Sequence, residues 1–120
     1  MKVIIRVSKS FKRQAKPLLK KYPSLKDELL ILENKLIENP RIGSPLGSDS
    51  YKIRLSVKSK RRGKSGGLRV ISHIDTEIVG IIKNEDGKII VNLISIYDKS
   101  ETDIISDKEL KDFISRLQNE

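Results

Sequence analysis

The hydrophobic period of this sequence changes once, and that change restricts the fold class. Apolar residues first recur at the spacing of one helix face: Leu25, Leu29, Leu32 and Leu36. After a loop rich in Gly, Ser and Pro at 41–50, they recur at every second position, as on one face of a strand: Tyr51, Ile53, Leu55 and Val57. Helices followed by hairpin-linked strands predict an α+β fold.

The other elements follow from the same two periods and from capping and breaking residues. A strand is predicted over 2–7, and then a helix that Ser8 or Ser10 caps, with a kink or restart at Pro17 and an end near Tyr22. Ser24 and Asp27 resemble a capping box for the second helix, which ends at Asn39-Pro40. Further predictions are strands over 67–74 and 88–98, with a break at Asp75-Thr76, β conformation over 77–83, a turn at 84–87, and a last helix from the Ser106/Glu109 capping box to about Gln118.

The predicted order is therefore β-α-α-β-β-β-α in one domain spanning residues 1–120. We expect a small antiparallel sheet with the N-terminal strand, a helical hairpin packed on one face, and a C-terminal helix. The strand 88–98 is apolar on both faces, which indicates the centre of the sheet. Lys52 and Arg54 then lie on the sheet face opposite the hairpin.

Positive charge is concentrated in one part of the chain. The net charge is +9, and no acidic residue occurs between Asp49 and Asp75. That window contains eight cations: Lys52, Arg54, Lys58, Lys60, Arg61, Arg62, Lys64 and Arg69. Such clustering is typical of a polyanion-binding surface, although a solvated basic loop would have the same composition.

Several kinds of chemistry are excluded by the residues present. The segment Gly63-Lys64-Ser65 ends like a phosphate-binding P-loop, but position 58 is lysine and a strand follows where a helix is required. There is no cysteine, and His73 is the only histidine, so thiolate sites and two-histidine metal or ribonuclease sites are absent. We expect no metal and no cofactor.

The opening apolar run is too short for a membrane span. Val3-Ile4-Ile5 is interrupted by Arg6, which also argues against a signal peptide, so we expect a cytoplasmic protein that does not bind membranes.

Lysine and arginine can carry out phosphoryl chemistry on RNA without other groups. They bind phosphate and stabilise the charge of the transition state, and a lysine whose pKa is lowered by neighbouring cations can transfer a proton. This chemistry suits RNA cleavage by the 2′-hydroxyl. His73 lies about 13 Å along the strand from Arg69, so it would belong to such a site only as part of a longer groove.

Several segments in combination resemble the RelE/ParE toxin superfamily. They are "SFKRQAKPLLKKYPSL", then "NP" and "G" with "LG", "YKIRL", the basic glycine-containing segment, "GGLRVI" and "ISIYDKSE", and the resemblance that they carry extends over nearly the whole chain. Within the superfamily, the chain is similar to the RelE- and HigB-like mRNA interferases of bacterial type II toxin–antitoxin systems.

The resemblance implies a fold, an activity and partners. The fold would be a small microbial-ribonuclease-like domain, and the activity would be ribosome-dependent mRNA cleavage that leaves a 2′,3′-cyclic phosphate and a 5′-hydroxyl. The partners would be mRNA, the ribosome and an acidic antitoxin that forms a hetero-oligomeric complex with the toxin.

The resemblance also assigns site residues. The catalytic set would be Lys52, Arg54, Arg69, Tyr97 and Lys99, where Tyr97 is the nearest substitute for a family tyrosine that aligns near Ile105. The RNA-binding set would be Lys58, Lys60, Arg61, Arg62, Lys64 and His73.

Two other functions fit the same fold. A ParE-like chain would inhibit DNA gyrase, but such chains typically lack the basic set at 52–69. A non-catalytic module that binds RNA or the ribosome would keep the basic surface, and Ile105 in place of the tyrosine is compatible with it.

Overall fold

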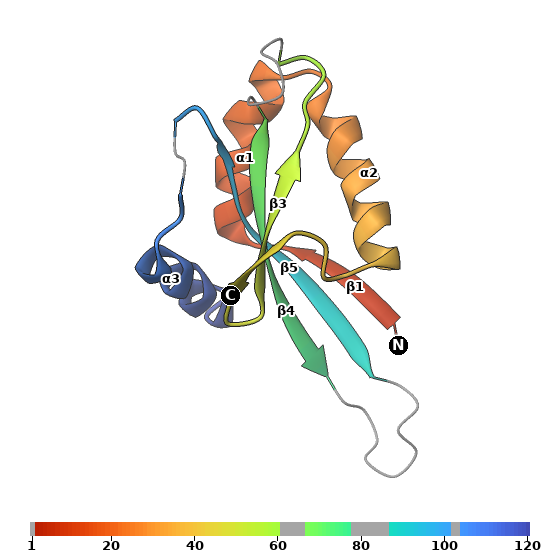
Figure 1. The fold of residues 1–120 in the computed structure, drawn as a ribbon, viewed down its shortest axis with the longest axis vertical. Coiled ribbons are helices and arrows are strands. Elements are labelled where there is room, and N and C mark those ends of the chain that lie inside the picture. The colour runs from red at the N-terminus through yellow and green to blue at the C-terminus, as the bar shows by residue number, and fades with distance from the viewer. Residues whose placement is uncertain (1, 61–66, 78–86, 102–103) are drawn as a thin grey trace.

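The helices and strands follow one another along the chain in an order close to the predicted one, with one additional strand, β2 at Ser44–Gly47 (Figure 1). The computed structural model describes residues 2–60, 67–77, 87–101 and 104–120. Its elements are β1 (Lys2–Val7), α1 (Lys9–Lys21), α2 (Leu25–Glu38), β2 (Ser44–Gly47), β3 (Ser50–Leu55), β4 (Leu68–Glu77), β5 (Lys88–Asp98) and α3 (Asp107–Gln118). The predicted α+β class is confirmed.

The sheet is mixed, where the sequence predicted an antiparallel one. Its strand order is β1-β5-β4-β3-β2, and every neighbouring pair is antiparallel except β1 and β5, which run parallel. The connection between these parallel neighbours is long, as it must be, and contains the helical hairpin and the strands β2, β3 and β4. β5, which the sequence predicted at the centre of the sheet, is an interior strand with a partner on both sides, but the central strand of the five is β4.

The capping predictions were right at two helices and wrong at one. The Ser8 hydroxyl accepts a hydrogen bond from the Phe11 amide at the start of α1, and Ser106 and Glu109 form a full capping box at α3. Ser24 makes no capping bond with its side chain; its hydroxyl instead bonds the Glu28 carboxylate. The same hydroxyl accepts a hydrogen bond of 3.0 Å from the Ser59 amide, so a tertiary contact takes the place of the cap.

Three local expectations also change. α1 continues through Pro17 as one helix and does not restart there. The predicted loop 41–50 contains β2, which pairs with β3, and β4 continues to Glu77 without a break at Asp75-Thr76. The β conformation and turn predicted over 77–87 fall mainly on residues 78–86, outside the described part of the chain.

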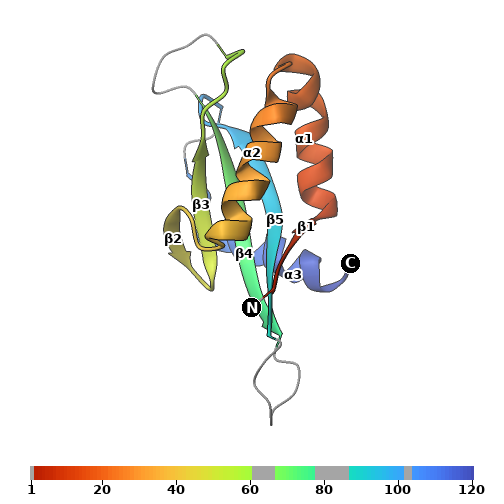
Figure 2. The same ribbon diagram turned by 90° about the vertical axis from the view of Figure 1, so that its right-hand side faces the viewer.

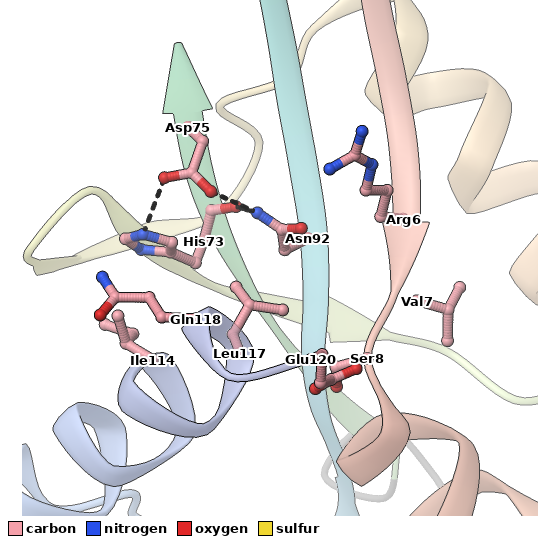
Figure 3. Close-up of a pocket in the computed structure, with 10 residues that line it drawn as sticks. All are labelled: Arg6, Val7, Ser8, His73, Asp75, Asn92, Ile114, Leu117, Gln118 and Glu120. Atoms are coloured by element: carbon pink, nitrogen blue, oxygen red, sulfur yellow. Dashed lines mark hydrogen bonds and ion pairs between the residues drawn. The ribbon is translucent and has the colours of Figure 1, made fainter. Parts of the chain in front are cut away.

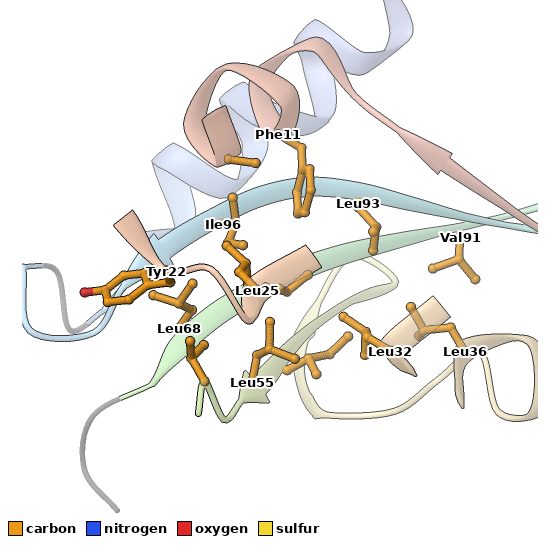
Figure 4. Packing of buried hydrophobic residues seen from close by; sticks show 14 of the residues in the cluster. Phe11, Tyr22, Leu25, Leu32, Leu36, Leu55, Leu68, Val91, Leu93 and Ile96 are labelled. Atoms are coloured by element: carbon orange, nitrogen blue, oxygen red, sulfur yellow. The ribbon is translucent and has the colours of Figure 1, made fainter. Parts of the chain in front are cut away.

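The main core lies between the sheet and the α1–α2 hairpin (Figures 2 and 4). Leu25 and Leu36 from α2 and Leu68 from β4 are fully buried there, and Phe11 from α1 is nearly so. Burying one such leucine contributes about 1.5–3 kcal/mol. This core fixes the face of β3, β4 and β5 that points toward the hairpin.

A second, smaller core lies on the other face, so the helices do not all cover one side. Leu110 of α3 packs on Ile71 and Ile94, and Val70, the neighbour of Ile71, belongs to the main core. Because successive side chains of a strand point to opposite faces, α3 lies on the face opposite the hairpin.

None of the helices in the described ranges is both long and apolar enough to cross a membrane.

Candidate anion-binding site

Three of the predicted catalytic residues lie next to one another across the sheet. Arg54 on β3 is directly opposite Arg69 on β4, and Arg69 is directly opposite Tyr97 on β5. Side chains in such positions have Cβ atoms about 5 Å apart on one sheet face. Like charges directly opposite are destabilising, so the Arg54–Arg69 pair is unfavourable unless an anion lies between the two guanidinium groups.

A cavity of about 500 Å³ opens at this pair. It is lined by Ile42, Gly43, Ser44, Lys52, Ile53, Arg54, Arg69 and Lys99. Four of the five residues assigned as catalytic therefore line one space, and every charged residue in its lining is a cation. We call this space the anion cavity. Its field favours phosphate, which arginine can hold through two parallel hydrogen bonds.

Arg69 is the most buried of these cations. It is 5% exposed, and its guanidinium donates one hydrogen bond of 3.2 Å, to the Leu68 carbonyl. Among the described residues no carboxylate pairs with it. A buried guanidinium without a counter-charge is costly, and a bound phosphate would remove that cost.

Tyr97, the fifth residue assigned as catalytic, is not part of the lining of the anion cavity. Its side chain is half-buried beside Arg69 in the strand register, and it packs against the small core that contains Ile71 and Ile94. Ile105 packs against the same core. Tyr97 is thus on the cavity side of the sheet, in contact with the small core around α3.

Lys60 belongs to a different environment from the one predicted. Its ammonium group forms an ion pair with Asp98, and the two side chains are 9% and 2% exposed. The Asp98 carboxylate also accepts hydrogen bonds from the Tyr22 hydroxyl (2.9 Å) and from the amide and hydroxyl of Ser100 (3.0 and 2.8 Å). Lys60 therefore fixes the end of β5 and is not available on the surface to bind RNA.

The pKa of Asp98 is set by opposing effects. Burial raises it, but the hydrogen bonds from Lys60, Ser100 and Tyr22 together outweigh burial and hold the pKa well below its usual range. Asp98 is therefore ionised at neutral pH.

The other predicted RNA-binding residues do not line the anion cavity. Lys58 is exposed and lines a groove between α2 and β3. Arg61, Arg62 and Lys64 lie outside the described residues. His73 is in another cavity, so the structure does not bring it together with Arg69.

The cavity around His73 has a volume of about 240 Å³ and contains a polar network (Figure 3). His73 Nδ1 is 3.2 Å from the Ser50 hydroxyl, and His73 Nε2 is 3.5 Å from Asp75. Asn92 donates to both the Asp75 carboxylate (3.0 Å) and the His73 carbonyl. These side chains mainly bond one another, and Ser50 is 1% exposed, so it is not an accessible nucleophile.

The sequence did not identify Gly43 as part of the anion cavity. Its φ of +109° is in the region that favours glycine, and a Cβ at this position would lie 2.5 Å from the Lys52 carbonyl oxygen. Glycine therefore allows the chain to pass close to β3 beside Lys52. The signal was present as a glycine in the loop 41–50, but the sequence did not say which strand it approaches.

Replacing Gly43 with alanine should destabilise the fold by more than about 1 kcal/mol, because the added methyl group is strained and also meets the backbone of Lys52. Gly47→Ala is the matched control: Gly47 has a φ of +86°, but a Cβ there would meet no atom within 4 Å. Thermal unfolding of both variants distinguishes the cost of a positive φ, which both positions have, from the cost of the contact with the Lys52 backbone, which only Gly43→Ala would make. Equal losses would show that the close approach to Lys52 has no energetic consequence.

In the described residues no three histidine, aspartate or glutamate side chains cluster as a metal site. Comparison of the chain with protein-family models and with curated protein sequences finds no match.

Proposed function

We propose that this protein is an mRNA endoribonuclease, acting on ribosome-bound transcripts as the toxin of a type II toxin–antitoxin pair. The observation that carries the proposal is the anion cavity, in which Arg54 and Arg69 oppose each other beside Tyr97 and no acidic residue lines the space. An enzyme that stabilises a doubly charged phosphorane-like transition state needs such a concentration of cations.

The proposed reaction uses the nucleophile of the substrate itself. The 2′-oxygen attacks the adjacent phosphorus, the bond from phosphorus to the 5′-oxygen breaks, and the products are a 2′,3′-cyclic phosphate and a 5′-hydroxyl. Arg54 and Arg69 bind the phosphate oxygens and stabilise the additional charge. One proton must leave the 2′-hydroxyl and one must reach the 5′-oxygen; Lys52, Lys99 and Tyr97 are the candidate groups for these transfers.

The proposal includes partners and a location. The substrate would be mRNA in the ribosome, which places the protein in the cytoplasm. An acidic antitoxin would silence it in a hetero-oligomeric complex, since a cationic cavity of this kind attracts carboxylates as well as phosphates.

The test is primer extension on a defined transcript with purified protein, with and without translating ribosomes. We expect cuts at codon positions only when ribosomes are present. Cuts in the absence of ribosomes would support the nuclease activity but contradict its dependence on ribosomes, and the enzyme would then act on free RNA.

An intact transcript in both reactions would contradict the proposal. In that case, accumulated DNA breaks in expressing cells would favour gyrase as the target, and co-sedimentation with ribosomes would favour a binding module without activity.

A further inference from the structure

The outer surface of the α1–α2 hairpin is used neither by the core nor by the anion cavity. Phe11 of α1 and Leu32 of α2 both point into the main core, so the two helices lie in one layer on the same face of the sheet (Figure 2). Residues about half a turn away from these core positions point away from the sheet. We call the exposed side chains of residues 9–21 and 25–38 the hairpin surface. Arg69 alternates with Val70, a residue of the main core, so the anion cavity lies on the other face.

The half of the hairpin surface that α1 provides carries only positive charge. Residues 9–21 contain no aspartate or glutamate. The exposed cations are Lys9, Lys12, Arg13, Lys16, Lys20 and Lys21. Like charges four residues apart, such as Lys12 and Lys16, destabilise a helix, and cations in the first turn oppose the helix dipole. α1 therefore bears an electrostatic cost that negative charge on its outer side would remove.

The half that α2 provides has an excess of negative charge. Its exposed acids are Asp27, Glu33 and Glu38, and its exposed lysines are Lys26 and Lys35, of which Lys35 lines the groove between α2 and β3. These acids do not neutralise α1 within one copy, because none of the ion pairs between residues that the structure describes involves either helix. The two halves of the surface thus have opposite charges that are not paired with each other.

The same surface exposes apolar side chains. Leu19 of α1 is 40% exposed, and Leu30 and Ile37 of α2 are 52% and 48% exposed. Leu30 and Ile37 are seven residues apart, so they lie on one line along the helix, roughly opposite the buried Leu32. RNA phosphates would gain nothing from these side chains and would be repelled by the acids beside them, whereas a protein partner would bury them. The combination of apolar groups and both signs of charge therefore favours a protein.

We propose that the hairpin surface binds the hairpin surface of a second copy of this chain, with α1 of each copy packed across α2 of the other. A two-fold axis parallel to the helices produces this arrangement, and the contact is then closed after two copies. A two-fold axis perpendicular to the helices in the contact plane would place α1 on α1 and bring the cations together. The charges therefore select the parallel axis.

The course of the hairpin determines which residues meet. α1 and α2 run in opposite directions and are joined by residues 22–24, so residues equally distant from this link lie at the same height (Figure 1). A two-fold axis parallel to the helices preserves the height of each residue. Lys12 of one copy therefore meets Glu33 of the other. Leu19 of one copy lies within one helical turn of Leu30 of the other, so apolar contacts accompany the ion pairs.

The contact is small, so the dimer should be weak and sensitive to salt. Helices of 13 and 14 residues are about 20 Å long and about 10 Å wide, so the hairpin surface measures about 20 by 20 Å. Stable interfaces bury roughly 1,200–2,000 Å² in total, and this one is at the lower end. We expect dissociation at micromolar concentration, and weaker association at high salt. Dimerisation leaves the anion cavity open and does not depend on the proposed function.

Sedimentation velocity of the purified chain, from low micromolar to a few hundred micromolar concentration, measures the dimer. Glu33→Arg should weaken association at least tenfold, because it places a cation against Lys12 of the other copy. Asp112→Arg is the matched control: it makes the same change of charge at an exposed position of α3 and should have less than a twofold effect. Circular dichroism checks that the variants are folded.

Reversal of the pair tests the contact itself. Lys12→Glu lowers the net charge and so the general repulsion between copies, yet it should also weaken the dimer at least tenfold. The double variant Lys12→Glu/Glu33→Arg restores opposite charges and should associate within threefold of the wild type. A monomer at every concentration, equal effects of Glu33→Arg and Asp112→Arg, or no recovery in the double variant would each overturn the proposal. So would a monomeric chain that binds duplex RNA in a way that Lys12→Glu weakens, because the surface would then be an RNA site.

Cross-linking tests the direction of the two-fold axis. The chain contains no cysteine, so single cysteines report the geometry directly. Lys16→Cys and Leu30→Cys lie at matching heights and leave the Lys12–Glu33 pair intact. Mixed in equal amounts and treated with a short bis-maleimide, the two variants should form a covalent heterodimer in much higher yield than either forms a homodimer alone. Strong cross-linking of Lys16→Cys alone would place α1 on α1, and that of Leu30→Cys alone would place α2 on α2; either result would overturn the proposed arrangement.

Discussion

Arg69→Met should abolish transcript cleavage, by about 10²–10³-fold or more, and at the same time stabilise the fold by about 1 kcal/mol. In the proposed reaction, cleavage falls because one of the two arginines that bind the scissile phosphate is gone. Stability rises because a 5% exposed guanidinium without a carboxylate partner among the described residues is replaced by an apolar chain of similar length. Primer extension with ribosomes measures the first effect, and urea unfolding measures the second.

Two further variants make the Arg69 result specific. Arg13→Met, on the exposed surface of α1, should change neither cleavage nor stability measurably. Arg69→Lys keeps the charge but loses the planar fork of donors, so it should retain part of the activity. Full cleavage by Arg69→Met would remove Arg69 from the site, and a loss of stability would show that the arginine has a structural role.

Asp98→Asn should lower the free energy of unfolding by about 3–5 kcal/mol. The amide cannot balance the charge of Lys60, which is 9% exposed, so a buried ammonium group is left without its partner. Urea unfolding at neutral pH measures the loss. Asp112→Asn, an exposed position on α3, is the control and should stay within about 0.5 kcal/mol of the wild type.

The double variant Lys60→Met/Asp98→Leu distinguishes the charge from the packing. Two apolar side chains leave no buried charge, so much of the stability lost in Asp98→Asn should return. If the double variant is as unstable as Asp98→Asn, the loss comes from the hydrogen bonds of Tyr22 and Ser100 and not from the unpaired lysine.

The lowered pKa of Asp98 also predicts a pH dependence. An aspartate in the unfolded chain has a pKa of about 3.9, and the folded protein holds it lower, so the folded state favours the ionised form. This stabilisation is fully present above about pH 4 and is lost as the pH falls below that value. Asp98→Asn should therefore show a smaller loss of stability between pH 5 and pH 3 than the wild type.

The sequence predicted which side of β3 carries cations, because alternation with a period of two needs no tertiary information. Lys52 and Arg54 could be assigned to one face for this reason. The sequence could not place Arg54 opposite Arg69 or Arg69 opposite Tyr97, since register between strands depends on the turn lengths and on the irregularity between Ile71 and Ser72.

Lys60 shows where charge patterning misleads. In the sequence it is one of a run of like charges, and such a run is usually solvated. Its partner Asp98 is 38 positions away along the chain, so only the folded arrangement shows that this lysine is buried. The sequence analysis also missed the parallel pairing of β1 with β5. The residues 2–7 show that a strand forms, but they do not show which other strand pairs with it or in which direction.

The residues on either side of the segment 61–66 are held by contacts that do not involve the segment itself. The stability of the fold should therefore depend little on which residues the segment contains. Lys60 is held by Asp98, and the Gly67 carbonyl accepts a hydrogen bond from the Lys99 amide. Both ends are therefore attached to the end of β5 by groups outside the segment itself. Neither contact uses a side chain of residues 61–66, so replacements in that segment should leave both contacts in place. Evolution could thus vary the three cations Arg61, Arg62 and Lys64, and with them the RNA that the proposed nuclease would prefer, while Lys60, Arg69 and the core stay the same.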